Sequence, residues 1–195
     1  MITKTLREWS GRLDEFLADE QEHFLFAVQD KTEVGYGFAK DVNFDYCRER
    51  EIATYDQKRD GGAIVFAAGN VTLAGVYDNR VHDPLLFYDI LIDFVDFLFE
   101  KDISAVLDNN DVLIDGEKVA SGFSYNFGTK FRRTYGGVQI SVKQDLEVIK
   151  NACKKTMIKP PAALENYGVD TNAVVQWCEA WFRKHKLVGE KNKIR

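Results

Sequence analysis

Residues 109–122 read NNDVLIDGEKVASG, and this stretch decides how the chain around it folds. Two β-prone runs flank Asp115-Gly116, a dipeptide typical of a two-residue hairpin turn. Strands joined in this way would place Asn110 and Asp111 at a height comparable to that of Lys118. A carboxylate there could hold Mg²⁺ on a nucleotide, while the lysine neutralises a phosphate and a developing oxyanion. Taken alone, an ordinary hairpin with exposed polar ends is the simpler interpretation.

The chain on both sides of this hairpin alternates helical and strand patterns. The glycine-punctuated stretch 58–77 predicts two strands around a glycine turn. Residues 84–99 predict a core helix with an acidic edge, capped by Asp83. The other predicted elements are helices at 3–20, 42–51 and 144–154, strands at 23–30, 34–39, 103–108 and 136–143, and a last helix capped by Asp170. The predicted fold is therefore α+β, with a mixed, mostly antiparallel sheet flanked by helices.

Length and composition limit the classes of protein that need to be considered. A length of 195 residues favours a single domain over 1–195, of which 188–195 reads as a frayed tail. Hydrophobic residues make up 45% and charged residues 29%, the mixture expected of a soluble globular protein. The net charge of −5 disfavours duplex nucleic acid as a partner. No apolar run predicts a signal peptide or a membrane span, and three cysteines without CxxC spacing favour the reducing cytoplasm.

A second candidate for chemistry is the glycine-rich segment KRDGGA at residues 58–63. Adjacent glycines let a ligand approach backbone N–H groups, and neighbouring basic side chains suit a phosphate or carboxylate. The segment is neither a Walker loop nor a GxGxxG motif. Taken alone, a tight turn between strands is again the simpler interpretation.

In their order and spacing, these two segments resemble the lipoate–protein ligase family, part of the wider biotin/lipoate ligase catalytic-domain fold. Residues 25–70 resemble that family's opening, from its first strand through the glycine-rich loop to Gly69-Asn70. Residues 110–122 resemble its Asn-Asp strand, and Lys118 follows Asn110 by eight residues, as the family's catalytic lysine does. Residues 136–150 and 157–169 continue the resemblance, which covers a core of about 23–185.

The resemblance implies an ATP-dependent enzyme that activates lipoate or octanoate as an acyl-adenylate and transfers the acyl group to a lysine of an acceptor protein domain. It implies that Lys118 is catalytic, and that Asp111, with Asn110 beside it, holds Mg²⁺ or orients the nucleotide. The implied substrate-binding residues are Arg59, Asp60, Gly61, Gly62, Ala63, Asn70 and Gly122. An apolar tunnel beneath the glycine loop would select the acyl group, with Val65, Phe66, Val71 and Leu73 as candidate lining residues.

The sequence also departs from the family's pattern. Asp56-Gln57 stand in place of an arginine pair, Asp60 in place of the first of three glycines, Phe66-Ala67 in place of His-Asp, and Gly136-Gly137 at a His-Gly motif. Two alternatives stay open because of these changes. One is a transferase of the same fold that uses a cysteine thioester, with Cys153 as the nearest candidate. The other is a catalytically silent member that binds a ligand or a partner.

A basic run of Lys130, Arg132 and Arg133 also invites a functional interpretation. It could receive an acidic acceptor domain. The solvated end of a hairpin is the simpler explanation for such a run of charges.

Overall fold

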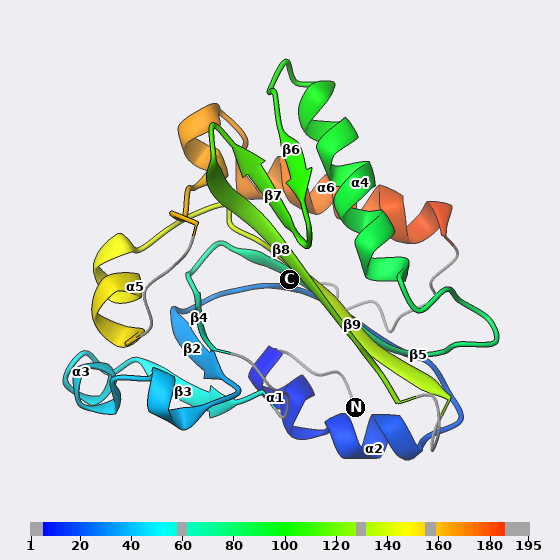
Figure 1. Cartoon of the computed structure of the whole chain (residues 1–195), viewed down its shortest axis with the longest axis horizontal. Helices are drawn as coiled ribbons and strands as arrows, with labels where there is room; N and C mark the ends of the chain where they lie inside the picture. The colour runs from blue at the N-terminus through cyan, green and yellow to red at the C-terminus, as the bar shows by residue number, and fades with distance from the viewer. Residues whose placement is uncertain (1–5, 58–61, 128–131, 155–158, 186–195) are drawn as a thin grey trace.

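The computed structural model describes residues 6–57, 62–127, 132–154 and 159–185. Its centre is a six-stranded antiparallel sheet with the order β1-β5-β9-β8-β7-β6 (Figure 1). This large sheet consists of β1 (His23–Val28), β5 (Val71–Asp78), β6 (Val106–Asp108), β7 (Asp111–Ile114), β8 (Glu117–Asn126) and β9 (Arg133–Ile140). In a smaller sheet, β2 (Glu33–Tyr36) pairs in parallel with β3 (Ala53–Asp56) and antiparallel with β4 (Ala63–Phe66).

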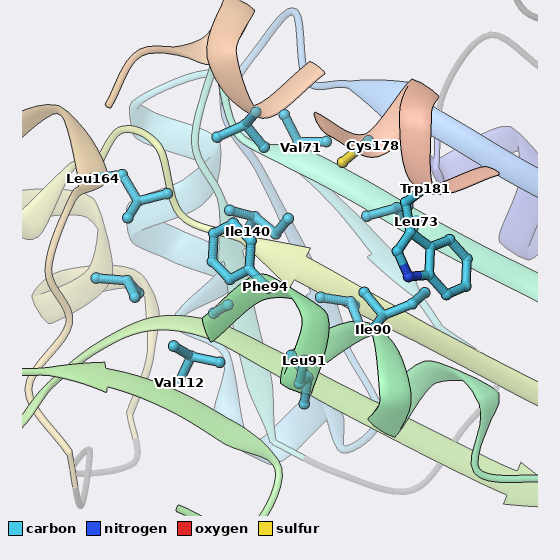
Figure 2. Close-up of a cluster of buried hydrophobic side chains, with 14 of the residues drawn as sticks. Val71, Leu73, Ile90, Leu91, Phe94, Val112, Ile140, Leu164, Cys178 and Trp181 are labelled. Atoms are coloured by element: carbon cyan, nitrogen blue, oxygen red, sulfur yellow. The ribbon is translucent and has the colours of Figure 1, made fainter. Parts of the chain in front are cut away.

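Two long helices cover one face of the large sheet. They are α4 (Leu86–Phe99) and α6 (Thr171–Lys184), which Figure 1 shows in green and in orange to red. Their apolar stripes pack into the main core against side chains of the large sheet, as Figure 2 shows. Fully buried members of this core include Val71, Leu73, Ile90, Phe94, Ile140 and Cys178.

The opposite face of the large sheet is covered by different elements. The helices α1 (Leu6–Gly11) and α2 (Leu13–Ala18) contribute Trp9 and Phe16, which pack with Leu25 and Tyr135 of the sheet. The small sheet adds Phe66 to the same cluster. Beside the small sheet, α3 (Phe44–Glu49) and α5 (Leu146–Ala152) share a third cluster, and the 3₁₀ turns η1 (Ala39–Asp41) and η2 (Leu164–Tyr167) join neighbouring elements.

The α+β prediction with a mostly antiparallel sheet is confirmed. The hairpin prediction also holds, since Asp115 and Gly116 have φ of 52° and 81°, as a two-residue turn with two left-handed residues requires. Asp170 caps α6 by accepting the backbone N–H of Ala173 at 2.8 Å. Among the residues that the structure describes, none of the helices is long and apolar enough to cross a bilayer.

The predicted single helix at 3–20 is wrong, because the described part divides at Arg12 into α1 and α2. Arg12 has φ −104° and ψ 9°, and its N–H bonds to the carbonyl of Trp9 at 3.0 Å, which is a tighter i to i−3 contact. Gly11, a weak helix former, precedes the break. The prediction for α4 is early by two residues, because Asp83 accepts the N–H of Leu85 and the helix begins at Leu86.

The two strands predicted within 58–77 exist, but they do not pair with each other. β4 belongs to the small sheet and β5 to the large sheet. Between them, Gly69 has φ 89°, and the N–H of Asn70 bonds to the carbonyl of Ala67 at 3.0 Å. This turn carries the chain from one sheet to the other, so that β4 lies over the face of the large sheet that α4 leaves open (Figure 1).

Candidate functional site

Lys118 and Asp111 meet at the hairpin of β7 and β8, as the sequence predicts. Lys118 Nζ lies 3.8 Å from Asp111 Oδ1, with exposed side-chain fractions of 33% and 13% respectively. The backbone of Lys118 is fixed on both sides, because its N–H donates to Pro160 O at 2.7 Å and its carbonyl accepts from Ala162 N at 2.9 Å. The segment that follows the predicted α5 helix therefore lies directly alongside the candidate catalytic lysine.

Lys159 is a further residue at this site, and the sequence analysis missed it. Its Nζ lies 2.9 Å from Asp111 Oδ2 and 2.9 Å from Asp108 Oδ2. These hydrogen bonds raise the pKa of Lys159, the bond to Asp108 contributing most and that to Asp111 next. The signal available in the sequence was a lysine directly before Pro160-Pro161, in a loop whose return to Lys118 no local pattern reveals.

A row of polar side chains leads away from this cluster across the large sheet. Asp111 pairs with Ser121, Ser121 with Gln139, and Gln139 with Thr72, so all four lie on the face opposite α4. Gln139 donates to the carbonyl of Val65 at 3.0 Å, which joins β4 to β9.

Thr72 closes the interior end of this row. It is 3% exposed, and its hydroxyl has no hydrogen-bond partner among the residues that the structure describes. The row therefore ends in a buried polar group whose hydrogen-bonding capacity the described residues leave unused.

Asn110 and Gly122 have structural partners. The side-chain amide of Asn110 donates to the backbone carbonyl of Gly122 at 2.6 Å, and the backbone carbonyl of Asn110 accepts the N–H of Gly122 at 2.7 Å. A Cβ at Gly122 would lie 2.9 Å from Leu91 Cδ1, on the α4 face. Close packing of α4 therefore explains this glycine, while the predicted ligand roles of Asn110 and Gly122 stay predictions.

The predicted substrate-binding residues are only partly described. Arg59, Asp60 and Gly61 lie outside the described residues, whereas Ala63 is the first residue of β4 and Gly62 directly precedes it. Asn70 is fully buried and its side-chain oxygen accepts the backbone N–H of Lys143 at 2.9 Å, so it ties the turn between β4 and β5 to the segment that follows β9. Its role in substrate binding stays a prediction.

The candidate tunnel residues separate by face. Val71 and Leu73 pack in the core beneath α4 and α6 (Figure 2). Lys118 lies on the opposite face of the large sheet, because it pairs with Leu113, the neighbour of the core residue Val112. Phe66 belongs to the cluster with α1 and α2, and Val65 to the cluster with α3 and α5. Of the four candidates, only Val65 and Phe66 therefore lie on the polar-row side of the large sheet, because both belong to β4.

The basic run does not present a free positive surface at every position. Arg133 is 4% exposed and donates to the backbone carbonyls of Gln21 and Asp19, so it ties β9 to the segment before β1. Arg132 is exposed at the hairpin end, and Lys130 lies outside the described residues. Arg133 is therefore neither a solvated hairpin residue nor free to receive an acidic domain, because its donors are bonded inside the protein.

The cysteines lack the character of activated nucleophiles. Burial raises the pKa of Cys153 to about 11 and also raises the pKa values of Cys47 and Cys178. A nucleophilic cysteine needs a lowered pKa so that its thiolate forms near neutral pH. The surroundings of Cys153 therefore disfavour the thioester mechanism.

A Mg²⁺ ion does not fit Asp111 as its side chain now lies. Both carboxylate oxygens face lysine ammonium groups, at 3.8 and 2.9 Å. Among the described residues, no group of three or more His, Cys, Asp or Glu side chains could hold a metal. Protein-bound Mg²⁺ is commonly held by one or two carboxylates together with substrate phosphates. The metal role of Asp111 stays a prediction that its present partners do not favour.

Solved structures similar to this chain include several lipoate ligases. The bipartite lipoate protein ligase of Thermoplasma acidophilum, studied with its E2 lipoyl domain, superposes with a TM-score of 0.75 at 16% identity, over 100% of this chain and 86% of that one. A lipoate-protein ligase A bound with ATP gives 0.73 at 13% identity, over 98% and 86%. LipL1 of P. falciparum in complex with lipoate gives 0.71 at 11%, over 99% and 61%. At these identities the likeness establishes the fold.

Family membership rests on a separate comparison. No curated protein matches the chain significantly. The model of the lipoyl protein ligase A/B catalytic domain matches residues 11–176, which is most of the chain and includes both candidate segments. The chain therefore belongs to the lipoyl protein ligase A/B catalytic-domain family.

Proposed function

We propose that this chain is an ATP-dependent ligase that activates lipoate or octanoate and transfers the acyl group to a lysine of an acceptor protein domain. The observation that carries the proposal is the placement of Lys118. Its ammonium lies beside Asp111, while hydrogen bonds from its backbone to Pro160 and Ala162 fix its main chain. Solved relatives with bound lipoate and bound ATP support the choice of substrates.

In the proposed first step, a carboxylate oxygen attacks the α-phosphorus of ATP, and the bond to the β-phosphate breaks to release pyrophosphate. In the second step, the acceptor amine attacks the acyl carbonyl, loses a proton and displaces AMP. Negative charge develops on phosphate oxygens in the first step and on the carbonyl oxygen in the second. A fixed cation between these groups stabilises both transition states more than the ground states, and we assign this role to Lys118.

The partner in the second step is an acceptor domain that presents a lysine. The archaeal relative was studied together with its E2 lipoyl domain, which supports an acceptor of this kind. Arg132, which is exposed just before β9, is one basic side chain available to such a domain.

The decisive experiment measures pyrophosphate release by the purified chain with ATP and either lipoate or octanoate. A reaction without carboxylic acid is the control, and intact-mass analysis of a lipoyl domain follows the transfer. We expect acid-dependent pyrophosphate release and a mass increase equal to the acyl group. No release with any medium-chain acid would refute the ligase assignment.

A catalytically silent, ligand-binding member is the second candidate, because the places of a family His-Asp pair hold Phe66 and Ala67. Both residues are 3% exposed and therefore supply packing instead of polar chemistry. Calorimetric binding of octanoyl-sulfamoyl-adenosine, an unreactive mimic of the acyl-adenylate, separates the two candidates. A silent member would bind the mimic without releasing pyrophosphate from ATP.

A further inference from the structure

Four charged side chains meet beside the start of β8. Lys118 and Lys159 supply two positive charges, and Asp108 and Asp111 supply two negative charges. Asp111 is shared, because each of its oxygens faces one of the two lysines. The two lysines therefore compete for one carboxylate, whose side chain is only 13% exposed.

The distances show which lysine holds the carboxylate. Lys159 Nζ bonds to Asp111 Oδ2 at 2.9 Å, whereas Lys118 Nζ stays 3.8 Å from Oδ1, beyond hydrogen-bond range. Lys159 Nζ also lies 2.9 Å from Asp108 Oδ2 and donates to Asp108 O at 3.1 Å. Lys159 Nζ therefore donates to Asp111 Oδ2 and to Asp108 O, and it also forms an ion pair with Asp108 Oδ2, so the three donors of its ammonium face three nearby acceptors. Lys118, in contrast, donates no hydrogen bond to either aspartate of this cluster.

The backbone couples the two lysines. Pro160 and Ala162, which follow closely after Lys159, both bond to the main chain of Lys118. The carbonyl of Pro160 accepts the N–H of Lys118, and the N–H of Ala162 donates to the carbonyl of Lys118. The rings of Pro160 and Pro161 fix the φ angles of both residues, one before the first of these bonds and one between the two, which restricts the route of the segment. Lys159 therefore reaches Asp111 from a segment whose position relative to Lys118 is set by the fold.

We propose that Lys159 is a positioning residue: it occupies Asp111 and so keeps the ammonium of Lys118 available to the anionic groups of the substrate. This inference rests on the proposed ligase function. Without Lys159, the nearly buried carboxylate loses its bonded partner, and the other cation that the described residues place beside it is Lys118. Lys118 would close the remaining distance and form a charge-assisted hydrogen bond with Asp111, in competition with the substrate.

The test compares wild type with Lys159→Met, which keeps most of the side-chain length without the charge, and with Lys159→Arg, which restores a cation. Lys150→Ala, the loss of an exposed lysine on α5, is the matched control. Each variant is assayed for affinity towards octanoyl-sulfamoyl-adenosine, for pyrophosphate release and for unfolding in urea. We expect Lys159→Met to weaken binding and slow release by ~10–100-fold, the effect of one charge-assisted hydrogen bond. Lys159→Arg should recover most of the loss.

A double-mutant cycle with Asp111→Asn distinguishes positioning from a merely structural role. If Lys159 acts by occupying Asp111, Lys159→Met should have little further effect once the carboxylate charge is gone. An equal loss in the Asp111→Asn background would overturn the proposal, because Lys159 would then act through the loop alone. Wild-type affinity and rate in Lys159→Met would overturn it as well. If wild type itself neither binds the mimic nor releases pyrophosphate, the ligase function fails and this inference falls with it.

Discussion

Replacement of Lys118 by alanine separates a catalytic lysine from an ordinary hairpin lysine, because the two roles predict opposite patterns of loss. The side chain is one-third exposed and its ion pair is 3.8 Å long, so the pair contributes about 0–1 kcal/mol to stability. Asp111 keeps its 2.9 Å bond to Lys159, and the variant therefore leaves no unpaired buried charge. The bonds to Pro160 and Ala162 involve only the backbone and persist. We expect the free energy of unfolding to change by less than about 1 kcal/mol.

Catalysis should respond far more strongly. The loss of one electrostatic contact to a developing oxyanion typically slows the reaction by ~10²–10³, which corresponds to roughly 3–4 kcal/mol. Pyrophosphate release with lipoate or octanoate measures the rate, urea denaturation measures folding, and Lys150→Ala serves as the control. Equal rates in wild type and Lys118→Ala, at matched folding, would remove Lys118 from the mechanism. A large loss of stability would point to a structural lysine instead.

Three further substitutions test other parts of the structure. Thr72→Val should raise the free energy of unfolding by about 1 kcal/mol in urea denaturation, because it removes a buried hydroxyl without a partner among the described residues. Weaker binding of the acyl-adenylate mimic by this variant would show that the hydroxyl contacts the ligand. Gly136→Ala should lower stability by about 1–3 kcal/mol, because its Cβ would lie 2.6 Å from a ring carbon of Phe87; an unchanged urea midpoint would contradict this packing. Cys153→Ala should leave ATP-dependent acylation within about twofold, because a thiol whose pKa is about 11 supplies little thiolate at neutral pH, whereas a thioester transferase would lose its activity.

The sequence predicts the positions of most strands and helices better than it predicts which strands pair with each other. Asp115-Gly116 specifies its turn locally, since both residues accept left-handed angles, and the prediction is correct. The glycine-punctuated stretch 58–77 also yields two real strands. Their assignment to different sheets depends on contacts with β2 and with β1 and β9, which lie far away in the sequence. Short-range patterns carry no information about such pairings, and β3 is missed for the same reason.

In the candidate site, too, the sequence predicts the residues that are close together in the chain and misses those that come from distant segments. The spacing of Asn110, Asp111 and Lys118 places a carboxylate and a lysine on neighbouring strands, and the structure brings these two together. Lys159 was not predictable, because it reaches Asp111 from a loop 48 residues later in the chain. The sequence does not show that the candidate tunnel residues Val71 and Leu73 face the core, because a strand alternates its faces and only the position of α4 and α6 shows which face is core.

Gly136 and Gly137, which stand at the family's His-Gly motif, lie where neighbouring aromatic side chains leave no room for a histidine. A Cβ at Gly136 would lie 2.6 Å from Phe87, and one at Gly137 would lie 2.8 Å from Phe123. Aromatic rings therefore occupy the space that a histidine side chain would need at either position. Gln139 lies on the same face as Gly137, since strand residues two apart share a face, and it keeps a polar group there. A histidine restored at Gly136 would collide with Phe87, so a test of whether its loss limits activity requires a smaller residue at position 87 in the same variant.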